Sequence, residues 1–106
     1  MSDMEKIFQS TSTARFLSLA EVMREIASYI AEKPEHSYEI IIGSDSAGTY
    51  NKPVSIITAL TVRRVGNGGR YFYVKGRPAI YRQVRDRIYA ETMSSITLAQ
   101  EIRGRL

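Results

Sequence analysis

The chain has 106 residues, 43% of them hydrophobic, which is enough for one small domain with a modest core. The absence of cysteine excludes disulfides, thiolate metal sites and cysteine nucleophiles, and the lack of a long apolar run or a signal-peptide pattern leads us to expect a cytoplasmic protein with no membrane partner. The charge is uneven: residues 1–45 have eight acidic and four basic residues, net −4, and residues 46–106 have eleven basic and three acidic residues, net +8.

The first predicted helix follows a polar N-terminal segment. Residues 1–17 are rich in serine and threonine and predict a loosely structured segment, with Phe8 and Phe16 as anchors to the core. Ser18 and Glu21 have the spacing of a capping box, in which each side chain bonds to the other's backbone. The helix after this cap has one buried stripe and ends at Lys33-Pro34. The stripe consists of Leu19, Val22, Met23, Ile26, Tyr29 and Ile30.

Three strands are predicted next. Residues 38–43 are apolar and rich in β-branched side chains, which predicts a strand covered on both faces. Residues 54–65 and 70–75 predict two further strands. The residues between those two, Gly66-Asn67-Gly68-Gly69, favour a tight hairpin because Asn-Gly and Gly-Gly supply the positive φ that such a turn needs.

A long helix is predicted over residues 79–103, with Gly104 as its stop. Its apolar positions are Ile80, Val84, Ile88, Ile96, Leu98, Ala99 and Ile102. The element order indicates an α/β fold, more exactly an α+β half-domain, in which the two helices cover a three-stranded, mainly antiparallel sheet. Because so small a sheet leaves its edges exposed, we expect a homo-oligomer.

Two carboxylates stand out in this arrangement. Glu91 lies on the predicted apolar face of the last helix, where an ionised group needs either an arginine or a divalent cation as its partner. Asp45 follows the first strand, in Gly43-Ser44-Asp45-Ser46, at the carboxyl end where open sheets carry ligand sites. An Asx-type turn is the alternative explanation for Asp45 alone. Together, the two residues predict a metal site with the carboxylates close to each other.

The basic half of the chain predicts a second kind of site. Its arginines are interleaved with tyrosines, and these side chains neutralise phosphates and stack on bases, respectively. A solvated basic face is the alternative. The candidate nucleic-acid-binding residues are Arg70, Tyr73, Arg77, Arg82 and Arg85.

Three segments together resemble the YkuK-like family, which is grouped with the ribonuclease H-like nucleases. They are the strand from Ile40 to Ser46, the hairpin around Gly66-Asn67-Gly68-Gly69, and the helical segment from Arg87 through Ser95 to Ala99. The resemblance covers nearly the whole chain and implies one ribonuclease H-like domain over residues 1–106. It also implies that Asp45 and Glu91 bind Mg²⁺ or Mn²⁺ and act as catalytic residues.

The chain departs from this family pattern after the last predicted helix. The fold normally continues with further strands and helices that supply the remaining carboxylates, and these are absent before Leu106. We therefore expect a metal-dependent nuclease relative that acts on or binds nucleic acid and is weak or inactive as this chain alone. The alternatives are a non-catalytic nucleic-acid-binding module and a structural, oligomerising protein.

Overall fold

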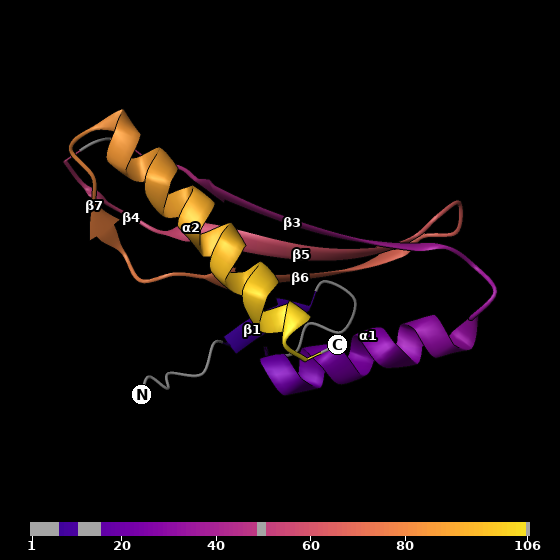
Figure 1. Cartoon of the computed structure of the whole chain (residues 1–106). Helices are drawn as coiled ribbons and strands as arrows, with labels where there is room; N and C mark the ends of the chain where they lie inside the picture. The colour runs from indigo at the N-terminus through magenta and orange to yellow at the C-terminus, as the bar shows by residue number, and fades with distance from the viewer. Residues whose placement is uncertain (1–6, 11–15, 49–50, 106) are drawn as a thin grey trace. The chain divides into compact units, whose positions relative to one another are not determined.

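The computed structural model of the chain describes residues 7–10, 16–48 and 51–105, and it divides into two compact units. Unit 1 lies within Met1–Ile41 and Ala59–Val74, and unit 2 within Ile42–Thr58 and Lys75–Leu106. Figure 1 labels most of the elements. In chain order they are β1 (Ile7–Ser10), β2 (Phe16–Ser18), α1 (Leu19–Glu32), β3 (Tyr38–Ser46), β4 (Pro53–Val54), β5 (Ile56–Arg64), β6 (Gly69–Lys75), β7 (Ala79–Ile80) and α2 (Val84–Arg103).

The larger sheet has five strands in the order β2-β1-β6-β5-β3, and β4 pairs with β7 in a separate two-stranded sheet. β1 is antiparallel to both β2 and β6. β3 and β5 also run in opposite directions, because the Val65 N–H donates to the Ser37 carbonyl at one end and Ser44 bonds to Thr58 at the other. The predicted mixture of two helices and an antiparallel sheet is therefore confirmed.

The prediction of three strands was wrong, because β1 and β2 add two more. Both come from the segment that we expected to be loosely structured; its other residues, 1–6 and 11–15, lie outside the described part. The strands are four and three residues long, too short for a periodic pattern. Phe8 is fully buried, as predicted, whereas Phe16 is 70% exposed and is not part of the core.

Unit 1 contains the predicted capped helix. The Ser18 N–H donates to Glu21 Oε1 at 2.8 Å, and the Glu21 N–H donates to Ser18 Oγ at 3.2 Å, so both halves of the capping box are present. The buried residues of α1 are Leu19, Val22, Ile26 and Tyr29, which confirms four of the six predicted stripe positions, and the other two, Met23 and Ile30, are half-buried. The other buried apolar residues of this unit are Phe8, Leu17, Leu60, Val62 and Phe72.

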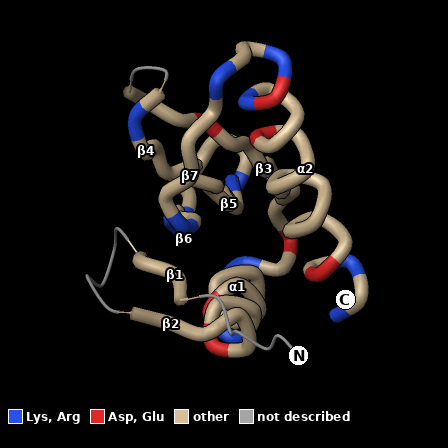
Figure 2. The backbone as a smooth tube through the Cα atoms, turned by 90° about the vertical axis from the view of Figure 1, so that its left-hand side faces the viewer, with Lys and Arg blue, Asp and Glu red and all other residues tan. Residues whose placement is uncertain are grey.

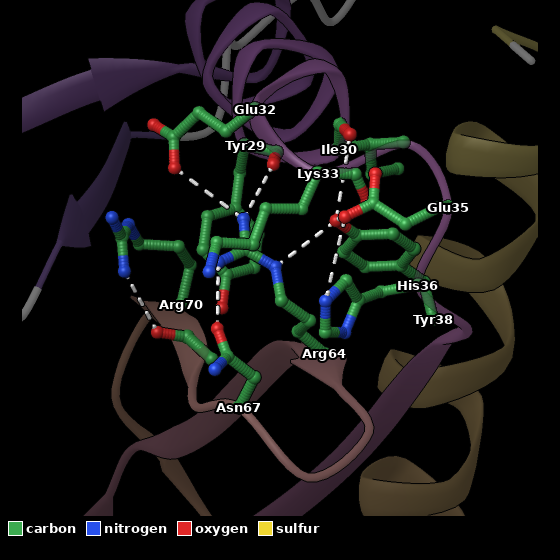
Figure 3. Close-up of polar contacts among 11 residues, drawn as sticks. Tyr29, Ile30, Glu32, Lys33, Glu35, His36, Tyr38, Arg64, Asn67 and Arg70 are labelled. Atoms are coloured by element: carbon green, nitrogen blue, oxygen red, sulfur yellow. Dashed lines mark hydrogen bonds and ion pairs between the residues drawn. The ribbon is translucent and has the colours of Figure 1, made fainter.

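An arginine completes one buried row of unit 1. Alternate residues of β5 are buried, and the row that includes Leu60 and Val62 ends at Arg64, which is only 5% exposed. The Arg64 guanidinium lies 3.9 Å from the centre of the Tyr29 ring and donates to the Tyr29 carbonyl at 2.7 Å. As Figure 3 shows, it also donates to Glu32, Tyr38 and Asn67. Arg64 thus connects the β5–β6 hairpin to the end of α1.

The predicted hairpin between β5 and β6 is confirmed. The Arg64 N–H donates to the Gly68 carbonyl at 2.9 Å, and Gly66 and Gly68 have φ of 77° and 97°. These positive φ values lie in the region that glycine adopts readily and other residues rarely adopt. The glycines of this turn therefore have the conformational role that the sequence predicts.

The prediction that residues 38–43 are covered on both faces was wrong. β3 is an edge strand of the five-stranded sheet, and Ile40 and Ile41 are 40% and 50% exposed. An apolar, β-branched run has the same appearance in a central strand and at an uncovered edge. The strand also extends past Gly43 to Ser46, so Asp45 lies within it.

In unit 2, the long helix begins at Val84 rather than at residue 79. Ala79 and Ile80 instead pair with Val54 and Pro53 as β7 and β4. The predicted apolar stripe of the helix was also wrong in part: Leu98 and Ile102 are buried, but Val84, Ile88 and Ile96 are 55%, 55% and 43% exposed. The helix therefore packs through a narrower face than its apolar residues indicate.

Candidate functional site

A row of hydroxyl groups connects β3, β5 and α2 within unit 2. Ser44 Oγ lies 2.7 Å from Ser95 Oγ and 2.9 Å from Thr58 Oγ1, both within hydrogen-bond distance. Ser44 and Ser95 are half-buried and Thr58 is 5% exposed, so each of these polar groups has a partner where water is scarce. These contacts hold the carboxyl-terminal half of β3 against the middle of α2.

β3 and α2 also bring three further side chains together, those of Ser46, Arg87 and Glu91. Arg87 Nε donates to Ser46 Oγ at 2.7 Å, and the Ser46 hydroxyl donates to Glu91 Oε2. Arg87 Nη1 also donates to the Gly48 carbonyl at 3.1 Å. All three side chains are half-buried. The Glu91 carboxylate therefore lies at the end of a hydrogen-bond chain that begins at a guanidinium, here called the Arg87–Ser46–Glu91 chain.

Gly48 has a conformation that fits the end of this chain. Its φ is +127°, and a Cβ atom at this position would lie 2.5 Å from Val54 Cγ1. A residue with a side chain would therefore be strained in its backbone and would also clash with Val54. The carbonyl that accepts from Arg87 thus belongs to a position where only glycine fits without rearrangement.

Asp45 lies between two residues of β3 that contact α2. Successive side chains of a strand point to opposite faces, and Ser44 and Ser46 both bond to α2. Alternation therefore directs Asp45 to the other face of β3, where its side chain is exposed. The structure brings Glu91 to Ser46 and Arg87, and the pairing of Asp45 with Glu91 in one metal site stays a prediction.

The donor set around these carboxylates limits which cations fit. Within residues 7–10, 16–48 and 51–105, no group of three or more His, Cys, Asp or Glu side chains could hold a metal ion. Mg²⁺ commonly uses one or two carboxylates and keeps several of its waters. Glu91 on α2, alone or together with Asp45 of β3, therefore fits at most a weakly held, hydrated cation, and two carboxylates are too few for two metal ions.

The candidate nucleic-acid-binding residues fall into both units. In unit 1, the Arg70 guanidinium lies 4.3 Å from the centre of the Tyr29 ring, and the Tyr73 hydroxyl donates to Gln9. In unit 2, the three candidates Arg77, Arg82 and Arg85 are exposed. Figure 2 shows basic and acidic residues mixed near the start of α2. Unit 2 therefore offers the more accessible of the predicted cationic side chains.

Arg87 and Ser46 are the two members of this site to which the sequence alone gave no firm role. A signal for Arg87 was present, because residues four apart share a helix face and Arg87 precedes Glu91 by four positions. Ser46 carries no comparable signal in the sequence. Its bridging contacts depend on how β3 lies against α2, which spacing along the chain does not predict.

The sequence model of the ribonuclease H-like family matches residues 21–106. The chain belongs to the ribonuclease H-like family. The match includes all of unit 2, and therefore also Asp45, Arg87 and Glu91. No curated protein and no solved structure gives a significant match to this ribonuclease H-like chain. Among the described residues, neither α1 nor α2 is long and apolar enough to cross a membrane.

Proposed function

We propose that this ribonuclease H-like chain is a cytoplasmic protein that binds nucleic acid and has little or no nuclease activity by itself. The observation that carries the proposal is the family match over residues 21–106, which points to a nucleic-acid-related function. The net charge of +8 over residues 46–106 favours binding to a polyanion. A narrower placement in the YkuK-like family is part of the proposal and rests on the resemblance of the motifs around Asp45 and Glu91.

The cation of this site is proposed to be Mg²⁺ or Mn²⁺, with Glu91 as one ligand and Asp45 as the second. Because Asp45 points to the other face of β3, this shared site requires its side chain to turn toward α2. A bound cation would supply activation of a water and stabilisation of the leaving oxygen in phosphodiester hydrolysis. Two carboxylates hold such a cation weakly, so we expect a dissociation constant on the order of millimolar. Glu91 supports this role by its place on the packed face of α2 beside Ser46.

Binding of the nucleic-acid backbone is assigned to the exposed arginines of unit 2, namely Arg77, Arg82 and Arg85. Arginine forms bidentate hydrogen bonds with phosphate, which lysine does not. Arg70 and Tyr73 are included as candidates from unit 1, where each already has an intramolecular contact. For this reason we expect substitution of the unit 2 arginines to weaken binding more.

The test combines a binding assay with a cleavage assay. Binding of labelled single-stranded, duplex and branched substrates is measured over a range of salt concentrations, and cleavage is measured with Mn²⁺. We expect salt-sensitive binding and little cleavage. Asp45→Asn and Glu91→Gln should weaken Mn²⁺ binding, measured by calorimetry. Robust cleavage that disappears in both variants would show that the chain is an active nuclease, and no binding at moderate salt would contradict the proposal.

The second candidate function is a nucleic-acid-binding module without any metal requirement. The observation that favours it is the Arg87–Ser46–Glu91 chain, because Glu91 is supplied with positive charge by the protein itself. Binding that is the same in EDTA and in Mn²⁺ would identify this module. Binding that strengthens with Mn²⁺ would identify the metal-dependent relative.

A further inference from the structure

The Glu91 carboxylate is bonded to Ser46, which is itself bonded to Arg87, so Glu91 has a source of positive charge within the protein. Ser46 donates its only hydroxyl hydrogen to Glu91, and its oxygen accepts from Arg87 Nε at 2.7 Å. Each bond in such a chain polarises the next, so the guanidinium strengthens the bond between the serine and the carboxylate. The positive charge of Arg87 therefore stabilises the negative charge of Glu91 through one intervening hydroxyl.

A cation that binds to Glu91 has to replace this arrangement. The Ser46 hydrogen occupies one lone pair of the carboxylate, and the nearby guanidinium repels any added positive charge. Both effects lower the affinity of the carboxylate for a divalent ion. If Arg87 moves away from Ser46, the repulsion is removed and the bond from Ser46 to Glu91 loses the polarisation that strengthens it.

We infer that Arg87 competes with the divalent cation for Glu91 and that a nucleic-acid phosphate regulates this competition by drawing Arg87 away. The inference rests on the proposed function, since it assumes that the cation and the nucleic acid bind at this site. It assigns to Arg87 a regulatory role in cation binding, separate from the backbone contacts given to Arg77, Arg82 and Arg85.

Two of the hydrogen-bond acceptors of Arg87 are weaker partners than a phosphate would be. Ser46 Oγ and the Gly48 carbonyl are neutral acceptors. A phosphate is charged and accepts two parallel hydrogen bonds from a guanidinium, so its bond to arginine is stronger than a bond to a neutral oxygen. Exchange of these two neutral acceptors for a phosphate leaves Glu91 more available to the cation. Because coupling of two ligands is reciprocal, the cation and the nucleic acid each strengthen the binding of the other.

Arg87→Met tests the inference, because methionine fills similar space and removes the charge. Calorimetry on the protein alone should show Mn²⁺ affinity at least about fivefold higher than in the wild type, the lower end of typical coupling between two sites. Ser46→Ala removes the bridge without changing the net charge, so it should also raise Mn²⁺ affinity. Arg103→Met, at the far end of the same helix, is the control for net charge and should leave Mn²⁺ affinity unchanged.

Coupling is measured from the anisotropy of a labelled single-stranded DNA oligonucleotide at constant ionic strength, with and without Mn²⁺. Mn²⁺ should strengthen binding to the wild type more than binding to Arg87→Met, and thermal melts identify a variant that is unfolded. Equal or weaker Mn²⁺ affinity in both Arg87→Met and Ser46→Ala, with DNA binding intact, would overturn the inference and leave the proposed function standing. Failure of the wild type to bind both Mn²⁺ and DNA would overturn the two together.

Discussion

Arg64 shows how a single cation is accommodated among apolar residues. Its three nitrogens donate to four acceptors, contributed by Tyr29, Glu32, Tyr38 and Asn67. Burial acts to lower the pKa of Arg64, but the hydrogen bonds to Tyr38 and Glu32 outweigh it, and the pKa is raised above its usual value. A raised folded-state pKa means that the stabilisation by this charge is present below the unfolded pKa and is lost only at strongly alkaline pH.

We predict that Arg64→Lys lowers the melting temperature, because an ammonium is compact and cannot reach four acceptors arranged around a planar fork. The matched control is Arg63→Lys at the preceding position. Arg63 donates to Glu39 at 2.8 Å with both side chains about half exposed, and exposed pairs contribute only about 0–1 kcal/mol. Thermal unfolding followed by circular dichroism compares the two variants. Equal melting temperatures would show that the buried contacts of Arg64 do not stabilise the fold.

The burial of Arg64 could have been predicted from the alternation of β5, since the row of Ile56, Thr58, Leu60 and Val62 leads directly to it. The orientation of Asp45 could not have been predicted in the same way. Its place at the end of an apolar strand was recognised from the sequence, but the face to which it points depends on which neighbours contact α2. Ser44 and Ser46 make those contacts, and serines carry no signal for burial.

At the scale of the elements, α2 packs through only part of its apolar surface. Leu98 and Ile102 are buried four residues apart, on the same helix face as Glu91 and Ser95. Tyr89, Met93 and Ile96 have the spacing of a second stripe and are 66%, 39% and 43% exposed. The packed face of α2 therefore mixes two apolar side chains with the polar network, which weakens its signal in the sequence.

We predict that Leu98→Ala destabilises the protein by about 2–5 kcal/mol, since the fully buried side chain would leave a cavity. Ile96→Ala, two residues earlier and on the exposed side, should change the free energy of unfolding by no more than about 0.5 kcal/mol. Urea denaturation of the two variants at equilibrium gives both values. A larger loss for Ile96→Ala than for Leu98→Ala would mean that α2 packs through its other face.

Elements with strong local signals were predicted well, whereas short ones were not. The capping box of α1 and the glycines of the β5–β6 turn are local features, so the sequence was sufficient for both. β1, β2, β4 and β7 are two to four residues long, too short for a periodic pattern, and the pairings of β1 with β6 and of β4 with β7 join strands that are distant in the chain. β7 replaced the expected first turns of α2 because Ala79 and Ile80 pair with β4.

At the scale of the whole molecule, β3 gives the larger sheet an apolar edge. It is nine residues long and lies last in the strand order, and Ile40 and Ile41 are substantially exposed. Edge strands with free backbone groups are templates for pairing with another chain. The assignment of residues 1–106 to one ribonuclease H-like domain stays a prediction, as does the homo-oligomer expected from this edge.

We predict that the chain forms a homodimer or a higher homo-oligomer in solution, through the edge of β3 or the exposed stripe of α2. Light scattering coupled to size-exclusion chromatography measures the mass. Ile41→Lys should shift the mass toward the monomer if β3 forms the contact, since a charge at the edge opposes pairing. Met93→Lys tests the α2 stripe in the same way. A wild type that stays monomeric at high concentration would contradict the prediction.

The close approach of Gly48 to Val54 has a consequence for how the two positions vary among relatives. A smaller residue at position 54 would relieve the clash with a Cβ atom at position 48, but it would not relieve the strain of a φ of +127°. Position 54 can therefore change while position 48 remains glycine, whereas the reverse change is opposed by two independent effects. An alignment of relatives should show this one-way dependence: varied residues at position 54 beside glycine, and side chains at position 48 only where the loop itself differs in length.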